Sequence, residues 1–99
     1  MDPHMYDQEL LASAVGRRLS LVRQVLGLSQ ADFAAGAQIK PNAWNNYESG
    51  RSRIGPDAAA RVCAVYGVDL NYIYLGDTSH LPYRIAHALD SLRRARGSG

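Results

Sequence analysis

The chain has 99 residues, a single cysteine and a net charge of +2. This length allows one domain whose core can form without disulfides or a structural metal, and the lone Cys63 favours a reducing, cytoplasmic location. No apolar run approaches the roughly 20 residues that cross a bilayer, so we predict neither a membrane partner nor a signal peptide.

The first predicted helix spans residues 8–26. Its apolar residues recur every three or four positions, which is the pattern of one buried stripe; they are Leu11, Val15, Leu19, Val22 and Leu26. Gly27 follows directly and is the residue type that commonly ends a helix.

Two short helices separated by a turn come next. Ser29 is predicted to cap the first of them, with Asp32 three residues on. That helix stops near Gln38, and Ile39 is expected to pack into the core. The other begins at Pro41, which suits a first helical position because its missing N–H would have no partner there.

The rest of the chain is also predicted to be helical. After a loop at 49–55, a fourth helix runs from Pro56 to Gly67 and a fifth from Asp69 to Gly76. A last amphipathic helix carries apolar residues at helical spacing, namely Leu81, Ile85, Leu89 and Leu92. No strand pattern or repeat occurs, so the predicted fold class is all-α.

The third helix has unusual chemistry, because it carries asparagines where a surface helix normally carries Glu, Lys or Ala. At 100° per residue, one arc is predicted to pack on the domain and holds Ala43, Trp44 and Tyr47. The opposite arc points outward and holds Asn42, Asn45 and Asn46. A bidentate Asn–adenine pair in the major groove contributes about 1–3 kcal/mol of discrimination. Three amides on one face therefore favour a helix that recognises DNA bases over an ordinary polar surface.

Residues 28–50 resemble the helix-turn-helix of the lambda-repressor-like, Cro-type (xenobiotic-response-element) family, and the resemblance runs from about Arg17 to Gly76. The matching positions are Leu28-Ser29-Gln30, Phe33-Ala34, Tyr47-Glu48, Gly50, Pro56 and Gly67-Val68. The resemblance implies a five-helix DNA-binding domain at 5–77, to which this chain adds the C-terminal helix at 78–96. Residues 1–4 and 97–99 look like remnants of an expression vector.

Carried over by position, the resemblance implies which side chains contact DNA. The base-reading residues would be Asn42 and Asn46, with Asn45 as a less regular contact and Pro41 limited to apolar contact. The phosphate-binding residues would be Gln30, Lys40, Arg51 and Arg53. Arg23 and Glu48 would form an ion pair that ties the first helix to the third.

Three residues depart from the family pattern. Gln38 stands where Gly is usual and must adopt a left-handed or nearby conformation. Lys40 replaces the usual Ser or Thr cap and puts a cation beside a positive helix end, which a phosphate would relieve. Pro41 occupies a position that often reads a base, yet it can donate no hydrogen bond.

The C-terminal helix has two interpretations. Helix-turn-helix proteins commonly bind paired half-sites about 34–36 Å apart as twofold dimers. We therefore predict that the stripe of Leu81, Ile85, Leu89 and Leu92 is a homodimer seam. The alternative is that this helix folds back over the domain.

Metal binding and catalysis are not predicted. Cys63, His80 and His87 match no zinc-ligand spacing, and Cys63 falls on the predicted buried stripe of the fourth helix. No nucleophile–base grouping or phosphate-cradling loop is present. We expect no enzyme, no cofactor and no metal.

Two classes of function remain. The favoured one is a sequence-specific regulator of transcription, a repressor that binds a palindromic or pseudopalindromic operator in double-stranded DNA as a homodimer. The alternative is an antitoxin-like or other interaction module that mainly holds a protein partner. Steep salt dependence and sequence preference would distinguish the first from the second.

Overall fold

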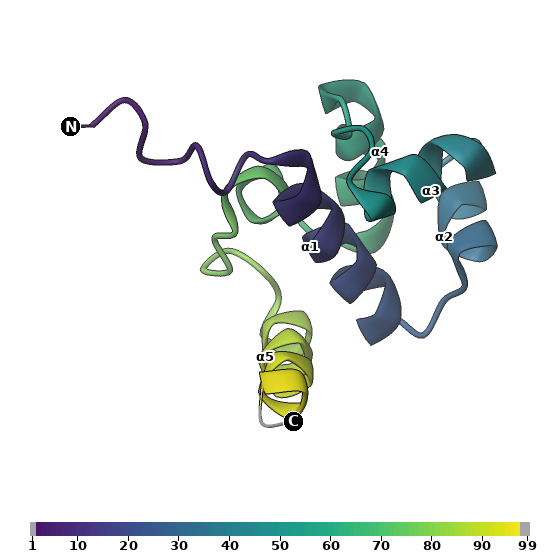
Figure 1. Cartoon of the computed structure of the whole chain (residues 1–99). Helices are drawn as coiled ribbons and strands as arrows, with labels where there is room; N and C mark the ends of the chain where they lie inside the picture. The colour runs from purple at the N-terminus through teal and green to yellow at the C-terminus, as the bar shows by residue number, and fades with distance from the viewer. Residues whose placement is uncertain (1, 98–99) are drawn as a thin grey trace.

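The computed structural model describes residues 2–97, in which helices joined by short loops surround a shared core (Figure 1). The elements are α1 (Ala12–Val25), α2 (Gln30–Gly36), α3 (Pro41–Ser49), α4 (Pro56–Tyr66), the π-helix η1 (Asn71–Leu75) and α5 (Tyr83–Gly97). No strand occurs in these residues, so the predicted all-α fold class is confirmed.

The core draws side chains from every helix, and α1 is its central element. Side chains from five different helices are almost completely buried, namely Leu19, Phe33, Trp44, Ile73 and Leu89. α1 contacts α3, η1 and α5. In Figure 1, α2 and α3 lie at one side of α1, and α5, in yellow, lies at another. α1 therefore connects the pair formed by α2 and α3 to α5.

α1 and α3 approach closely at Gly16. A Cβ atom at this position would lie only 2.2 Å from the carbonyl oxygen of Tyr47 in α3. Any larger residue would push the two helices apart, because backbone cannot yield as a flexible side chain can. Gly16 therefore helps to set where α3 lies, a role that the helical spacing alone does not reveal.

The turn between α2 and α3 is closed by two backbone hydrogen bonds. The N–H of Ile39 donates to the carbonyl of Ala34 at 2.8 Å, and that of Gln38 donates to Ala35 at 3.1 Å. This is the Schellman arrangement, which requires a left-handed residue after the cap. Gln38 takes that role with a φ of +57°, as implied by its standing where the family usually has Gly, and Ile39 is buried in the core as expected.

Three helices begin later than the sequence predicts, and one of them is α5, which begins at Tyr83 rather than at residue 78. α1 begins at Ala12 rather than at residue 8, because the backbone of Leu11 is extended (φ −59°, ψ 140°); the carbonyl of Glu9, before this break, accepts a hydrogen bond from Arg18 at 3.0 Å. The fifth helix is a π-helix that begins at Asn71 rather than at Asp69. The Asp69 side chain instead accepts a hydrogen bond from the N–H of Tyr72 at 2.9 Å, as a helix cap does.

α5 folds back onto the domain. The stripe predicted as a dimer seam is largely buried within its own chain, with exposed fractions of 8% for Leu81, 8% for Ile85 and 1% for Leu89. Leu92 is partly buried against the same core, and Arg96 donates to the side chain of Gln24 in α1 at 2.7 Å. Contrary to the prediction, this stripe is not available as a dimer interface.

Candidate nucleic-acid interface

The two faces of α3 differ as its sequence predicts. Trp44 is completely buried and stacks on Phe33 of α2, with 4.7 Å between ring centroids. On the opposite side Asn42 and Asn45 are exposed, whereas Asn46 is partly buried. The predicted inward position of Trp44 is therefore confirmed, and α3 presents amides to solvent from a firmly packed helix.

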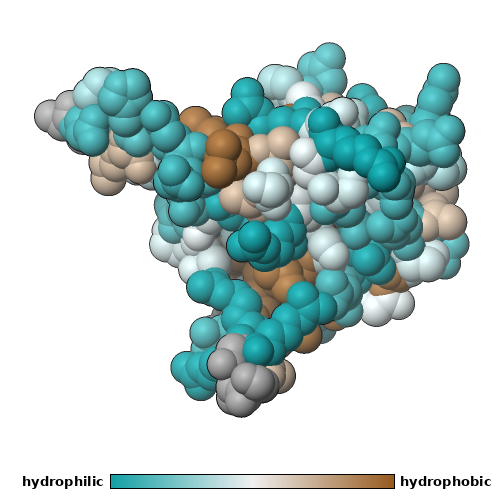
Figure 2. All heavy atoms as spheres, in the orientation of Figure 1, coloured by the Kyte–Doolittle hydropathy of each residue, from teal (hydrophilic) through white to brown (hydrophobic). Residues whose placement is uncertain are grey.

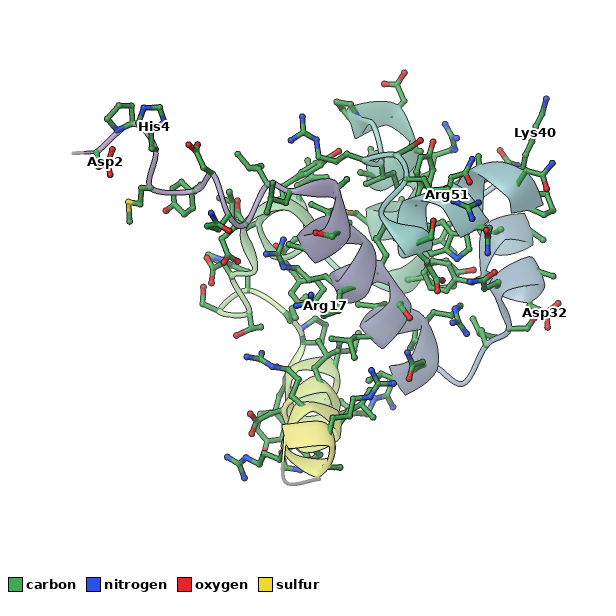
Figure 3. The ribbon with its side chains drawn as sticks, in the orientation of Figure 1. Asp2, His4, Arg17, Asp32, Lys40 and Arg51 are labelled. Atoms are coloured by element: carbon green, nitrogen blue, oxygen red, sulfur yellow. The ribbon has the colours of Figure 1, made fainter. Side chains whose placement is uncertain are left out.

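The N-terminal end of α3 has no side-chain cap. Lys40 is the cap residue, with an extended backbone (φ −64°, ψ 141°) and no capping hydrogen bond. Its side chain is exposed and projects away from the protein (Figure 3). Pro41 is also exposed, at the first position of the helix. The first turn of α3 thus combines N–H groups that lack a side-chain cap with an exposed positive charge.

The C-terminal end of α3 orders the loop that follows. The backbone carbonyl of Asn46 accepts hydrogen bonds from the N–H groups of Arg51 at 3.1 Å and Ser52 at 3.2 Å. The guanidinium of Arg51 reaches the side-chain oxygen of Asn46 at 3.5 Å. Arg51 is exposed at the end of the molecule where Lys40 also lies (Figure 3). The structure therefore brings Asn46 and Arg51 together.

Arg53 has a contact that the sequence did not predict. Its guanidinium donates to the carbonyl of Leu10 at 2.8 Å and so joins the loop after α3 to the segment before α1. The side chain remains exposed. This hydrogen bond uses one of the five N–H donors of the guanidinium.

Glu48 is the centre of a buried polar network. Its side chain is only 5% exposed and forms the predicted ion pair with Arg23, at 2.7 Å from Nε and 3.0 Å from Nη2. The same carboxylate accepts hydrogen bonds from Gln30 at 3.1 Å and from the indole N–H of Trp44. Arg23 also donates to the carbonyl of Leu28. One carboxylate thus joins α1, α2 and α3.

The electrostatic state of Glu48 follows from these contacts. Burial raises the pKa of its carboxyl group, but hydrogen bonds from Arg23 and Gln30, the charge of Arg23 and the bond from Trp44 outweigh burial. The pKa therefore lies below the ordinary value of 4.5, so the carboxylate is charged at neutral pH and holds its donors in place.

Gln30 lies in this network rather than free at the surface. Its amide nitrogen donates to Glu48, and its amide oxygen accepts a hydrogen bond from Asn45 at 3.2 Å. The predicted phosphate contact of Gln30 could use only its remaining amide proton or its backbone N–H. The family resemblance implied the ion pair of Arg23 and Glu48 but not this link between Gln30 and Asn45, for which the sequence carries no signal.

The end of the molecule formed by α2, α3 and the following loop carries unpaired positive charge. Within residues 2–97, none of Lys40, Arg51 and Arg53 forms an ion pair with a carboxylate. The charge of Glu48 is matched by Arg23, so among the described residues of this end only the exposed carboxylate of Asp32 on α2 opposes the three cations. This end is largely hydrophilic in Figure 2. The arrangement suits a polyanion such as DNA.

We also looked among the described residues for a reactive thiol, a metal site and a membrane-spanning helix. Cys63 is partly rather than fully buried, and burial, assisted by the charge of Asp69, raises the pKa of its thiol and so disfavours the thiolate. Among residues 2–97, no three His, Cys, Asp or Glu side chains are grouped to hold a metal. No helix in that range has the length and apolar character to cross a membrane.

Comparison with known proteins agrees with this geometry. Residues 14–71, more than half of the chain, match a helix-turn-helix domain family of the Cro and lambda-repressor type. The matched range includes most of α1, all of α2 to α4 and the buried network around Glu48, and it excludes α5. The comparison with curated proteins gives no match, and neither does the comparison with solved structures.

Proposed function

Since this chain belongs to the helix-turn-helix domain family, we propose that it is a sequence-specific DNA-binding regulator that places α3 in the major groove. The observation that carries the proposal is the exposed amide face of α3, held in place by the Glu48 network. An α-helix with its side chains is about 10–12 Å in diameter, which fits a major groove about 12 Å wide.

The side chains divide into base-reading and phosphate-binding groups. Asn42 and Asn46 read base edges, and within residues 2–97 Asn46 keeps both amide protons free because only its side-chain oxygen is engaged, by Arg51 at 3.5 Å. Asn45 contributes less because its amide nitrogen already donates to Gln30, and Pro41 makes apolar contact at most. Phosphate contacts come from the exposed cations at both ends of α3, with a smaller contribution from the partly engaged amide of Gln30. These cations are Lys40, Arg51 and Arg53.

We further propose that the protein represses transcription as a homodimer on a twofold operator, in the compartment that holds the DNA. This part rests on the twofold geometry of helix-turn-helix operators. Since Leu81, Ile85 and Leu89 are buried in the chain's own core, any dimer contact must use another surface. Sedimentation of the protein–operator complex would give its stoichiometry, and one protomer per operator would contradict the dimer.

Selection of bound sequences from a random DNA pool, followed by affinity measurements over a range of salt concentrations, tests the function itself. We expect a recurrent motif and an affinity that falls with salt by a slope of about −0.9 for each phosphate contacted. No enriched motif together with no salt dependence would contradict DNA binding and would favour a module that holds a protein partner.

Lys40→Ser should change stability and DNA binding in opposite directions. Serine can accept a hydrogen bond from the N–H of Ala43, as Ser29 does from Asp32 in α2, and the change removes a cation from the positive helix end. We expect the free energy of unfolding to rise by about 1 kcal/mol. DNA affinity should fall on all sequences, and the salt slope should decrease by about one.

Chemical denaturation and salt-dependent binding measure the two effects of Lys40→Ser. Arg84→Ser is the matched control, because it also removes one exposed positive charge but lies on α5. It should leave the salt slope unchanged. A Lys40→Ser variant that binds DNA as well as the original protein does would remove Lys40 from the phosphate-binding group.

A further inference from the structure

A hollow lies between α1, η1 and α5, apart from the proposed DNA-binding face. Its volume is about 230 Å³, and its lining includes Ala14, Arg17, Leu21, Tyr72, Gly76 and Arg93. Figure 2 shows apolar surface between α5 and the rest of the molecule, flanked by hydrophilic side chains. Arg17 lies on the side of α1 toward α5, whereas Lys40 lies at the far end of the molecule (Figure 3).

The positive charge of the hollow is only partly compensated. Arg18 is 12% exposed and forms an ion pair with Glu9, and it also donates to the carbonyl of Ile73 at 2.8 Å. Within residues 2–97, Arg17 and Arg93 have no carboxylate at ion-pair distance. Two guanidinium groups, one from α1 and one from α5, therefore line the same hollow without a counter-charge.

Two of the side chains that line the hollow, Leu21 and Tyr72, are held in place by burial and by a hydrogen bond. Leu21 is buried, and the hydroxyl of Tyr72 is held by a hydrogen bond to the carbonyl of Arg18 at 3.3 Å. Gly76 has a φ of +76°, and a Cβ atom there would lie 2.8 Å from the Glu9 carboxylate. A larger residue at Gly76 would be strained and would disturb the Glu9–Arg18 pair. The site thus combines a fixed apolar lining with cations at its edge.

We propose that this hollow binds a small molecule that carries a carboxylate or phosphate group, with the anion held between Arg17 and Arg93. Guanidinium groups bind both anions through paired, charge-assisted hydrogen bonds. The volume is below the roughly 300 Å³ at which drug-sized ligand pockets begin, so the ligand is small. Such a ligand would join α5 to α1, the helix whose Arg23 holds Glu48 of α3. The proposal does not depend on the protein being a DNA-binding regulator.

Calorimetric titration of the full chain with inorganic phosphate and with succinate, at an ionic strength held constant with chloride, tests this site. We expect at least one of the two anions to bind, and which one binds identifies the preferred chemistry. Arg17→Ala and Arg93→Ala should each weaken that binding by about tenfold or more, the loss of one charge-assisted contact. Arg93→Lys should retain more affinity than Arg93→Ala.

Arg94→Ala is the matched control. This neighbouring arginine is 81% exposed and pairs with Asp90 at 2.9 Å, so its removal should leave anion binding unchanged. Equal weakening in the Arg93→Ala and Arg94→Ala variants would show a general charge effect and overturn the proposal. Absence of binding by both anions would also overturn it, as would a loss of DNA affinity in Arg93→Ala without any change in anion binding.

Discussion

Glu48→Ala should lower the free energy of unfolding by about 3–5 kcal/mol, the usual cost of removing one partner from a buried ion pair. The carboxylate is 5% exposed and accepts hydrogen bonds from Arg23, Gln30 and Trp44. Alanine would leave these donors unpaired in a region with little access to water. Urea denaturation followed by circular dichroism measures the change.

Asp90→Ala provides the comparison for Glu48→Ala. It breaks an ion pair whose side chains are both more than half exposed, so it should cost at most about 1 kcal/mol. If the two variants lose similar stability, the Glu48 network does not hold the helices together as described. The Glu48→Ala variant should also lose DNA affinity, because Glu48 positions α3 without being a DNA contact itself.

The depressed pKa of Glu48 adds a pH dependence to this comparison. A carboxyl group whose pKa is lower in the folded than in the unfolded protein stabilises the fold above the unfolded value. That stabilisation is lost as pH falls below the ordinary 4.5 and through the lower native pKa. In Glu48→Gln, which cannot titrate, stability should fall less as pH drops from neutral to below 4.5. An unchanged pH profile would contradict the depressed pKa.

Asn46→Ala should weaken binding to the selected DNA site by about 1–3 kcal/mol and relax the preference at one base position. Asn42→Ala should do the same at a different position, because the two side chains are about one helical turn apart on α3. Competition binding against a panel of single-base variants of the site measures both the loss and the position affected.

Two further asparagines serve as controls for this measurement. Asn71→Ala removes an exposed amide from η1 and should leave DNA binding unchanged. Asn45→Ala should have a smaller effect than Asn46→Ala, since the Asn45 amide already bonds to Gln30. Full operator affinity in Asn46→Ala would remove that residue from the base-reading group.

Local sequence patterns predicted much of the fold and of the candidate site. The spacing of apolar residues placed the helices. The resemblance to the helix-turn-helix family, in which Gly usually holds the turn position, implied the left-handed backbone of Gln38, found at φ +57°. The same spacing separated buried Trp44 from the exposed Asn42. These features are predictable because they depend on residues within one or two helical turns, where periodicity and capping dominate.

The sequence by itself determined an all-helical chain with an amide-bearing third helix and a C-terminal helix that must bury one face. Only the tertiary structure decided that this face packs against α1 of its own chain, that Gln30 joins the Glu48 network, and that Arg17 and Arg93 line one hollow. Burial of apolar surface is non-directional, so a stripe such as that of α5 shows that a face will be covered without showing by what. Contacts between residues far apart in the chain depend instead on how the helices cross, which no local pattern contains.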